Sequence, residues 1–338
     1  MGPCPIHRQD TPRPLSPDTA EGNNMATAVS SVAQLSLHEL STPFSTPSPR
    51  PAFTGSCEYY ANGVTDITPP PPRSARQIAS EIKVGFGLRS PSWNNLTVMP
   101  DDRVIKDLFF KINSHNALAP ADSVGNMYPT YRFNRHQNVV PHDYCRLTVM
   151  GSQYINASPV LLLGNCYIAT QAPIDETMGH FVALVSEQKV DTIVTLAMPI
   201  EKGEVKALDY WTQSAQSSRV LMEEGDERVV ERMLLMDNRQ VRQLHYENWP
   251  DHGAPKTDLF KKILEEANSE NPLLVHCSAG IGRTGSFIVA HSIIRSQVPL
   301  NQSPLVETAL RARHFRPGTI TTPVQLKAVI EVIRASKQ

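Results

Sequence analysis

The sequence predicts an α/β fold, with one domain built on a central twisted mixed sheet that is flanked by helices and preceded by a disordered tail. First, a buried apolar run at 272–275 enters a glycine-rich turn and then a helix with apolar residues over 287–294. Second, short alternating or apolar runs typical of strands recur between 146 and 246. Third, large apolar residues are scarce before about residue 75, which separates a tail from a domain.

Residues 1–100 are expected to form a mostly disordered tail and linker, because proline, serine and threonine are dense there. The patch 25–40 carries spaced valines and leucines, which suit a segment that folds on a partner or chaperone, or an apolar stretch of disorder. The run Pro69–Pro72 has polyproline II character and suits an SH3-type ligand or a plain spacer. Residues 74–88 give a weak helical pattern.

The domain begins at residue 101 in this interpretation. Asp101 or Asp102 can cap a helix that continues to about Asn113, because apolar residues recur on one face. The strands expected in one mixed sheet are 146–149, 154–157, 160–163, 167–170 and 192–196. A hairpin-like return is expected over 226–236 and 241–246. The later helices are 176–188, 257–268 (capped and amphipathic), 303–313 and 323–336, with Pro323 suited to a first helical position.

Composition excludes several classes of protein. The net charge of −1 gives no electrostatic argument for nucleic acid, and no apolar run of about 18 residues predicts a membrane span. The five cysteines are odd in number and irregularly spaced, which favours a reducing, cytoplasmic compartment over a disulfide scaffold or a zinc site. The N-terminus lacks the basic and apolar pattern of a secretory signal. We expect a monomer with no metal and no cofactor.

The stretch 276–285 predicts an anion site. The N–H groups of the turn can converge on one point, where the N-terminus of the next helix adds positive potential. Gly280 and Gly282 let the backbone curl, and Arg283 offers a planar fork of donors to two phosphate oxygens. Cys277 stands in this cradle, where the positive field favours the thiolate, its nucleophilic form. The sequence therefore predicts phosphoryl transfer.

Cys277 alone would not carry this prediction, since a lone cysteine is most often a small buried apolar residue. The histidine, glycines and threonine around it fit the same motif, which makes an accidental match rare. Thioredoxin-like chemistry is disfavoured because the chain has no Cys-x-x-Cys. Rhodanese-like and arsenate-reducing proteins also use a cysteine-containing anion loop, so residues elsewhere have to exclude them.

The run HCSAGIGRTG resembles the signature loop of the protein tyrosine phosphatases, in the form commonest in the phosphotyrosine-specific branch. The likeness covers the chain from about Asp101 to the C-terminus, with matching order and spacing. The similar segments are the phosphotyrosine-recognition segment 134–147, two central strand segments 154–157 and 167–173, the glutamate-bearing segment 201–206 with 210–211, and the mobile acid-bearing loop 245–253. The resemblance implies a catalytic domain over 101–338 that hydrolyses phosphotyrosine in signalling proteins.

The resemblance also implies a role for each matching residue. Cys277 would attack the phosphorus, and Asp251 would protonate the leaving group as its loop closes. The phosphate oxygens would be held by Arg283 and by backbone N–H groups of Ser278, Ala279, Gly280, Ile281 and Gly282. The supporting residues would be Thr284 (a hydrogen bond to the sulfur), His276 (loop orientation), Trp249 (loop closure), Glu201 (pairing with Arg283) and Arg313 (the acid-loop hinge).

The chain departs from the family pattern in two regions, the recognition segment and the segment near the C-terminus. His136 stands where the family usually has the tyrosine that stacks on the substrate ring, and Asn138 where an acidic residue often contacts the peptide. Near the C-terminus the family usually has two glutamines, the first of which positions the hydrolytic water. Here the first is Thr321 and only the second, Gln325, remains. Either Gln325 takes over that role or hydrolysis of the intermediate is slower.

Three functions stay open at this point. The first is an active phosphotyrosine phosphatase, and the second is a catalytically weak module that binds or traps phosphotyrosine. The third is a broad-specificity or phosphoinositide phosphatase, although the loop lacks the extra basic residues typical of those enzymes. The Ser/Pro/Thr-rich tail resembles those of type III-secreted virulence effectors, which enter a host cell, and a cytosolic eukaryotic phosphatase with a regulatory tail fits too.

Overall fold

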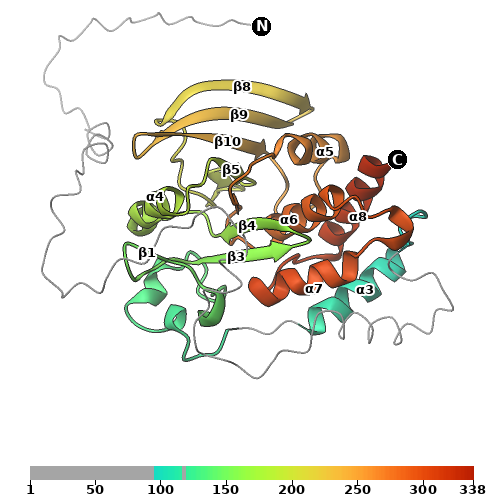
Figure 1. Cartoon of the computed structure of the whole chain (residues 1–338), viewed down its shortest axis with the longest axis horizontal. Coiled ribbons are helices and arrows are strands. Elements are labelled where there is room, and N and C mark those ends of the chain that lie inside the picture. Colours follow the sequence, from blue (N-terminus) through green and yellow to red (C-terminus); the bar gives the residue numbers. More distant parts are fainter. Residues whose placement is uncertain (1–94, 116–118) are drawn as a thin grey trace, which may run out of the picture. The chain divides into compact units, whose positions relative to one another are not determined.

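A mixed β-sheet forms the centre of the domain (Figure 1). The computed structural model describes residues 95–115 and 119–338. In spatial order the seven strands are β3 (Ala157–Leu162), β4 (Asn165–Thr170), β11 (Leu273–His276), β5 (Thr192–Thr195), β10 (Arg239–Glu247), β9 (Glu227–Met236) and β8 (Ala215–Glu224). The strands β4, β11, β5 and β10 run parallel, and antiparallel neighbours extend both edges. The predicted α/β fold with one central mixed sheet is confirmed.

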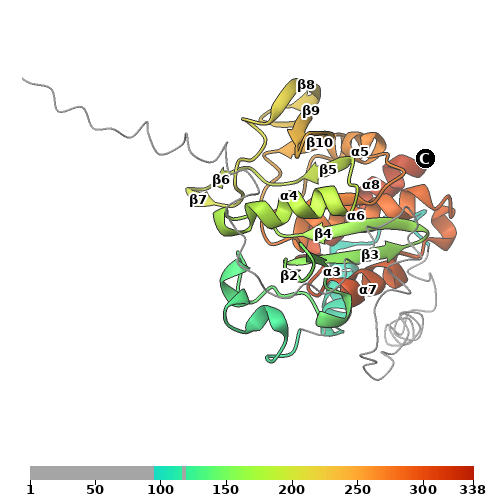
Figure 2. The same cartoon turned by 60° about the vertical axis from the view of Figure 1, so that its left-hand side comes forward.

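Helices cover both faces of this sheet (Figure 2). One face is covered by α4 (Met178–Glu187). The other is covered by α3 (Asp102–Ser114), α5 (Thr257–Glu266), α6 (Gly282–Arg295), α7 (Leu305–Phe315) and α8 (Pro323–Lys337). Short 3₁₀ turns occur at Val124–Asn126, Thr130–Phe133, Asp143–Cys145, Asp175–Thr177 and Leu300–Gln302.

Strand alternation explains why the domain has an apolar core on each side of the sheet. Along β11, Leu274 belongs to the core under α4, whereas Leu273 and Val275 belong to the core under α6 and α8. Ile193 and Val194 of β5 divide in the same way. Because successive side chains of a strand point to opposite faces, a run of apolar residues is what a strand buried on both faces requires.

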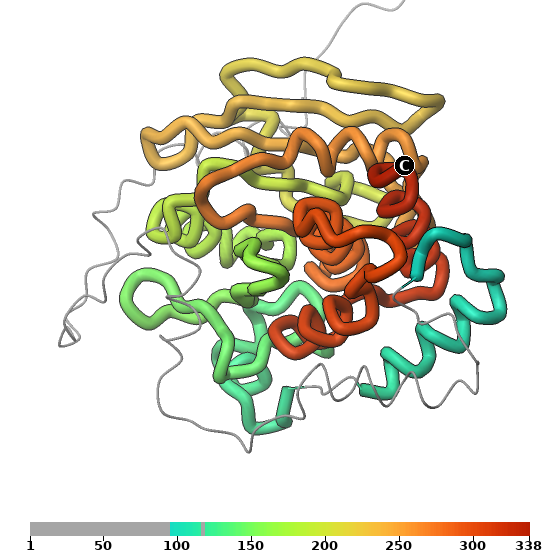
Figure 3. Tube along the Cα trace, turned by 45° about the vertical axis from the view of Figure 1, so that its right-hand side comes forward, coloured from blue at the N-terminus to red at the C-terminus, as the bar shows by residue number. Residues whose placement is uncertain are grey.

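The helix α3 lies beside the C-terminal helices, as the blue-green and red tubes in Figure 3 show. Asp101 caps it by accepting a hydrogen bond from Val104 N–H at 2.9 Å, as predicted from the sequence. One residue that precedes the expected start of the domain at residue 101 also packs against it. Leu96 is fully buried, and its N–H donates to the carbonyl of Leu300 at 2.7 Å. A single buried leucine carries no periodicity, so the sequence did not reveal this contact.

The structure differs from the sequence-based expectations at three elements. The edge strand β8 was not predicted, because most of its side chains are exposed and its sequence is polar. The runs near 146–149 and 154 lie outside the main sheet, in a two-stranded ladder of β1 (Thr148–Val149) and β2 (Gln153–Tyr154). Helix α5 begins at Thr257, but the residue before it makes no side-chain cap.

A second short ladder, β6 (Ile200–Glu201) with β7 (Glu204–Val205), was also not predicted as strands. It forms the hairpin that carries the glutamate-bearing segment. The predictions for the tail, the patch 25–40 and the weak helix 74–88 lie outside the described residues. Within the residues that the structure describes, no helix has the length and apolar character needed to cross a membrane.

Candidate active site

The loop between β11 and α6, residues 277–281 (the phosphate loop), is held from its outer side. Its carbonyl groups accept hydrogen bonds from Ala172 N–H and from the guanidinium of Arg316. The acceptors are Ser278 O at 2.9 Å, Ala279 O at 3.0 Å and Gly280 O at 3.1 Å. Because C=O and N–H of a trans peptide unit point in opposite directions, the N–H groups that follow these carbonyls turn inward. The loop is a cradle of donors at the N-terminus of α6.

Glycine is required where this loop packs against its neighbours. Gly280 has φ +72°, and a Cβ there would lie 2.1 Å from the carbonyl oxygen of Thr170 on β4. A Cβ at Gly282 would lie 2.7 Å from Thr321 Oγ1. Cys277 opens the loop and is 4% exposed, at the floor of the cradle. These contacts explain why the motif needs small residues around the thiol.

Arg316 holds the phosphate loop from behind, and the sequence motif did not reveal it. It is fully buried, and it lies 36 residues beyond the glycine whose carbonyl it holds. Burial lowers the pKa of Arg316 to about 10, so the guanidinium is still charged at neutral pH. The arginine therefore adds a fixed positive charge behind the phosphate loop.

Arg283, in the first turn of α6, connects the phosphate loop to two other segments. Its guanidinium donates to Glu201 Oε1 at 2.6 Å, to the carbonyl of Trp249 at 3.0 Å and to Asp251 Oδ1 at 3.3 Å. Burial would lower the pKa of Arg283, but the charges of Cys277, Glu201 and Asp251 outweigh it and raise the pKa. The pairing with Glu201 is the one that the resemblance implied. It fixes the plane of the guanidinium.

Residues 248–256 (the acid loop) connect β10 to α5 and lie against the site. Asp251 contacts Arg283 and also Lys206 Nζ, at 3.3 Å. Burial would raise the pKa of Asp251, but the charges of Arg283, His252 and Lys206 outweigh it and hold the pKa below its usual value. The carboxyl group is therefore ionised at neutral pH when the site holds no substrate. Lys206 had no role in the sequence prediction, since nothing local indicates that it reaches the acid.

Trp249 anchors the acid loop in the apolar core. Its indole is 1% exposed and lies between the rings of Tyr246 and Phe260, with centroids 5.2 and 4.8 Å away. Its N–H donates to the carbonyl of Gly253 at 3.2 Å, which closes the loop on itself. The tryptophan thus fixes the position from which Asp251 reaches the site.

His276 is a structural residue. Its Nε2 lies 2.8 Å from the hydroxyl of Tyr210 and 3.2 Å from that of Thr195, and its Nδ1 lies 3.1 Å from the carbonyl of Cys277. Burial lowers the pKa of His276 to about 4, so the ring is neutral. A neutral ring with partners on both nitrogens has no spare lone pair for use as a base, and the role of His276 in orienting the loop stays a prediction.

The recognition segment brings His136 to the rim of the phosphate loop. Its Nε2 lies 3.1 Å from Ser278 Oγ, and burial together with the charges of Arg135 and Lys206 lowers its pKa. Arg135 holds the segment in place by donating to the carbonyls of Ala172 at 3.2 Å and Pro173 at 2.5 Å. The neutral His136 ring therefore stands beside the phosphate loop, whereas the nearby Asn138 is exposed.

Gln325 and Thr321 form one unit beside the phosphate loop. Gln325 Oε1 accepts from Thr321 N–H at 2.9 Å and from Thr321 Oγ1 at 3.0 Å. A Cβ at Gly282 would lie 3.0 Å from Gln325 Nε2, so the amide group packs directly on the start of α6. The Gln325 oxygen, which would lie 3.1 Å from the same Cβ position, is occupied by its two bonds from Thr321.

Two supporting contacts differ from expectation. Among the described residues Thr284 Oγ1 has no hydrogen-bond partner, so the predicted bond to the sulfur of Cys277 is not formed. Arg313 donates to Asn113 Oδ1 at 3.1 Å and to Ile320 O at 2.8 Å, and neither partner belongs to the acid loop. Thr322, two residues beyond Ile320, is the residue that reaches the acid loop, at His252 O, 3.1 Å away.

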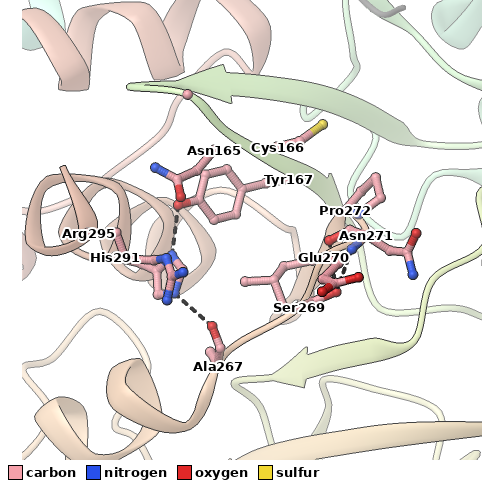
Figure 4. A pocket seen from close by; sticks show the side chains of 12 residues that line it. Asn165, Cys166, Tyr167, Ala267, Ser269, Glu270, Asn271, Pro272, His291 and Arg295 are labelled. Carbon is pink, nitrogen blue, oxygen red and sulfur yellow. Dashed lines mark hydrogen bonds between the residues drawn. The ribbon is translucent and has the colours of Figure 1, made fainter. Parts of the chain in front are cut away.

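The surface has a cleft that predicted site residues line and a pocket that they do not line. A cleft of about 580 Å³ lies between the glutamate-bearing segment and the acid loop, and Lys206, Asp226 and Asp251 line it. A smaller pocket lies at the other end of the sheet, where β4 and β11 begin (Figure 4). There the Nε2–H of His291 donates to Ala267 O and its Nδ1 accepts from Tyr167 Oη, each at 2.8 Å, so both ring nitrogens are occupied. No predicted site residue lines this second pocket.

A nucleophilic thiol in an anion cradle, with a carboxyl group on a covering loop, is the arrangement expected of a cysteine-dependent phosphatase. A model of the protein-tyrosine phosphatase family matches residues 130–335. The chain belongs to the protein-tyrosine phosphatase family.

Relatives with curated names support this family assignment. The chain is 38% identical to human receptor-type tyrosine-protein phosphatase H over 221 residues, which are 57% of this chain and 20% of that protein. It is 33% identical to mouse receptor-type tyrosine-protein phosphatase eta over 235 residues, 60% of this chain and 19% of that protein. It is 32% identical to human tyrosine-protein phosphatase non-receptor type 2 over 237 residues, 60% of this chain and 57% of that protein. The chain thus spans about a fifth of the receptor-type relatives.

Proposed function

We propose that this protein hydrolyses phosphotyrosine in other proteins through a cysteinyl-phosphate intermediate. The observation that carries the proposal is the position of Arg283. Its buried guanidinium contacts both Glu201 and Asp251, and the residue lies in the first turn of the helix that follows the loop beginning with Cys277. A phosphate bound by Arg283 would therefore lie between the thiol and the carboxyl group.

In the first step the Cys277 thiolate attacks phosphorus, an S–P bond forms and the P–O bond to the tyrosine ring breaks. Asp251 gives its proton to the departing phenolate oxygen. The inward N–H groups of the phosphate loop and Arg283 hold the three remaining oxygens as charge redistributes. Each group has a defined task in this step.

The protonation of Asp251 depends on the substrate. In the empty site its contacts with Arg283 and Lys206 keep it ionised. A phosphate dianion at Arg283 competes for that guanidinium and brings negative charge next to the carboxylate, which favours its protonated form. Binding of the substrate thus prepares the acid for the first step.

In the second step water attacks the phosphorus of the intermediate, the S–P bond breaks and Asp251 accepts the proton of the water. Inorganic phosphate leaves, and the Cys277 thiolate is restored. The Nε2 of Gln325 can donate to the attacking water or to a phosphate oxygen. Its oxygen is occupied by Thr321, so it has no free acceptor for a proton of that water.

This occupied oxygen favours a second function, in which phosphotyrosine is bound and turned over slowly. If Gln325 cannot orient the water fully, the intermediate accumulates and the second step limits the rate. The protein would then be a catalytically weak member of the family, with the phosphoryl group held on Cys277 after the dephosphorylated tyrosine has left. A rapid burst of phenol release followed by slow turnover would distinguish this function from fast catalysis.

The thiolate also bears on where the enzyme works. Cys277 has to stay reduced to act as a nucleophile, so we propose action in a reducing compartment such as the cytoplasm, as a monomer. Residues 1–100 are free of proposed site residues, and we propose that any partner or chaperone binds there.

The test of this function is a comparison of three substrates at matched concentration: a phosphotyrosine peptide, a phosphothreonine peptide of the same sequence and a phosphoinositide. We expect turnover of the first and little of the other two, because the thiol is nearly buried and a long aryl phosphate reaches it best. Equal turnover of the phosphoinositide would support a broad-specificity phosphatase. Binding of phosphotyrosine without release of phosphate would support the trapping module.

A further inference from the structure

One turn of the sheet holds both ends of the acid loop. The turn between β8 and β9 comprises residues 224–227. At the start of the acid loop, Asn248 Nδ2 donates to the carbonyl of Asp226 at 2.5 Å. At its end, Lys256 N–H donates to Glu227 Oε2 at 3.3 Å, and Lys256 Nζ donates to the carbonyl of Glu224 at 2.7 Å. Two positions eight residues apart along the chain are therefore fixed to the same few residues.

The conformation at both contacts is specific. Asn248 has φ +66°, a left-handed conformation that asparagine tolerates better than most residues. On the turn, a Cβ at Gly225 would lie 2.9 Å from Lys256 Nζ, so the lysine packs closely over a glycine with φ +66°. The fit of the loop ends to the turn thus depends on residue type on each side.

Glu227 is the central residue of this anchor. Its side chain is buried, and its Oε2 accepts from Tyr246 Oη at 2.6 Å as well as from Lys256 N–H. Tyr246 Oη also accepts from Lys256 N–H, at 3.0 Å, so the three groups form a closed set of hydrogen bonds. Burial and the Glu227 carboxylate raise the pKa of Tyr246, so its hydroxyl stays protonated and remains a donor.

This anchor connects directly to the site. The ring of Tyr246 packs on the indole of Trp249, 5.2 Å away between centroids. The carbonyl of Trp249 accepts from Arg283, and Asp251 follows two residues later. A shift of Tyr246 or of Lys256 would therefore be passed to the carboxyl group of Asp251 through a packed ring or through the backbone of the loop.

We infer that Glu227 is a positioning residue for the reaction: it fixes the acid loop so that Asp251 reaches the leaving group. The inference rests on the proposed function, in which Asp251 is the acid. The middle of the loop has other supports, from Arg283, Lys206 and Thr322, so the loss of Glu227 loosens the loop without releasing it. The expected effect is a misplaced acid in a protein that still binds phosphate.

The kinetic test compares Glu227→Ala with Glu227→Gln and with Glu223→Ala, in which a neighbouring exposed glutamate of β8 is removed. The measured quantity is kcat/KM for phenyl phosphate, whose leaving group needs a proton, and for 2,4-dinitrophenyl phosphate, whose leaving group does not. We expect Glu227→Ala to lower the first roughly tenfold, below the ~100-fold that a 1 Å misplacement can cost, and to leave the second within about twofold. Glu227→Gln keeps an oxygen acceptor and should stay close to wild type.

Equal losses on the two substrates would overturn the inference, since they would mean that Glu227 supports the whole domain and not the acid. No loss on either would overturn it as well. If Glu227→Ala does not fold, Asn248→Gly is used instead. It removes the bond to Asp226 and suits the left-handed backbone, and the same dependence on leaving group is expected.

A second measurement does not need catalysis and separates this inference from the proposed function. Amide hydrogen exchange over residues 248–256 should be faster in Glu227→Ala than in wild type and in Glu223→Ala, because the Lys256 N–H loses its acceptor. Unchanged exchange in these residues would overturn the anchor itself. A wild-type protein that shows this exchange pattern but hydrolyses no aryl phosphate would leave the anchor standing and contradict the proposed function.

Discussion

The phosphate loop and the acid loop meet at Arg283, yet the protein holds them in different ways. The phosphate loop is fixed along its length: its carbonyls are bound by Ala172 and Arg316, and Gly280 packs tightly against β4. The acid loop is fixed at its two ends on the turn between β8 and β9 and by the buried Trp249, whereas Asp251 itself is held by ion pairs with Arg283 and Lys206, which a bound phosphate can replace. A cradle that binds charge gains from a fixed geometry, because no reorganisation is needed during the reaction. The acid loop covers the bound substrate, so it has to move aside to let the substrate enter.

Because of this difference, substitutions in the phosphate loop and in the acid loop should have different effects on catalysis. A change in the phosphate loop should impair every substrate alike, because each one has a phosphate to hold. A change in the acid loop should impair only those substrates whose leaving group needs a proton. Leaving-group dependence is therefore the property that distinguishes the two loops.

The largest expected effect is that of Cys277→Ser in the phosphate loop. The hydroxyl is a far weaker nucleophile, so turnover should be lost while the fold and phosphate binding remain. Steady-state assays with phenyl phosphate measure turnover, and thermal unfolding shows whether the fold is retained. Residual activity above about 1% of wild type, where several kcal/mol of catalysis should be lost, would contradict the covalent mechanism.

The next effect is that of Asp251→Ala in the acid loop. We expect kcat/KM for phenyl phosphate to fall by about 100-fold or more, and that for 2,4-dinitrophenyl phosphate to fall far less. The physical reason is that dinitrophenolate leaves without a proton. Equal losses on both esters would mean that Asp251 is not the acid.

Arg316→Lys tests the fixed geometry of the phosphate loop. Lysine has no planar fork and cannot make both hydrogen bonds to the loop carbonyls in the same way. Loss of one charged hydrogen bond, worth about 1.5 kcal/mol, should lower kcat/KM about tenfold. The decrease should be the same for both aryl esters, and a marked difference between them would contradict the contrast between the loops.

The smallest expected effect is that of a substitution at His136, at the rim of the phosphate loop. His136→Tyr should lower KM for phosphotyrosine peptides about two- to tenfold, because ring stacking is worth about 0.5–1.5 kcal/mol beyond burial. The substitution also removes the hydrogen bond between His136 Nε2 and Ser278 Oγ. Both groups are neutral and the His136 side chain is half-buried, so this loss should cost less free energy than the stacking gains. A phosphothreonine peptide is the control, since it offers no ring. A rise in KM would show that the bond to Ser278 dominates.

The same contrast explains what the sequence could predict. Strand, turn and helix of the phosphate loop follow one another within 272–294, so their pattern is local and was recognised. The Asp101 cap of α3 is local too. Arg316, Lys206 and Glu227 act across long stretches of chain, and no local pattern indicates which partner an arginine, lysine or glutamate will meet. The edge strand β8 was missed because an exposed strand needs no apolar alternation.

The central claim is that phosphate passes through Cys277, and trapping of the intermediate tests it most directly. Wild-type protein is mixed with an excess of a phosphotyrosine peptide, quenched in acid within milliseconds, digested and analysed by mass spectrometry. We predict one phosphate on the peptide that contains Cys277 in the wild-type protein and none in Cys277→Ser. In Asp251→Ala, with a dinitrophenyl ester as substrate, a larger fraction of this peptide should carry phosphate, because hydrolysis of the intermediate is slowed. Turnover without phosphate on Cys277 at any quench time, or phosphate on another residue, would contradict the account.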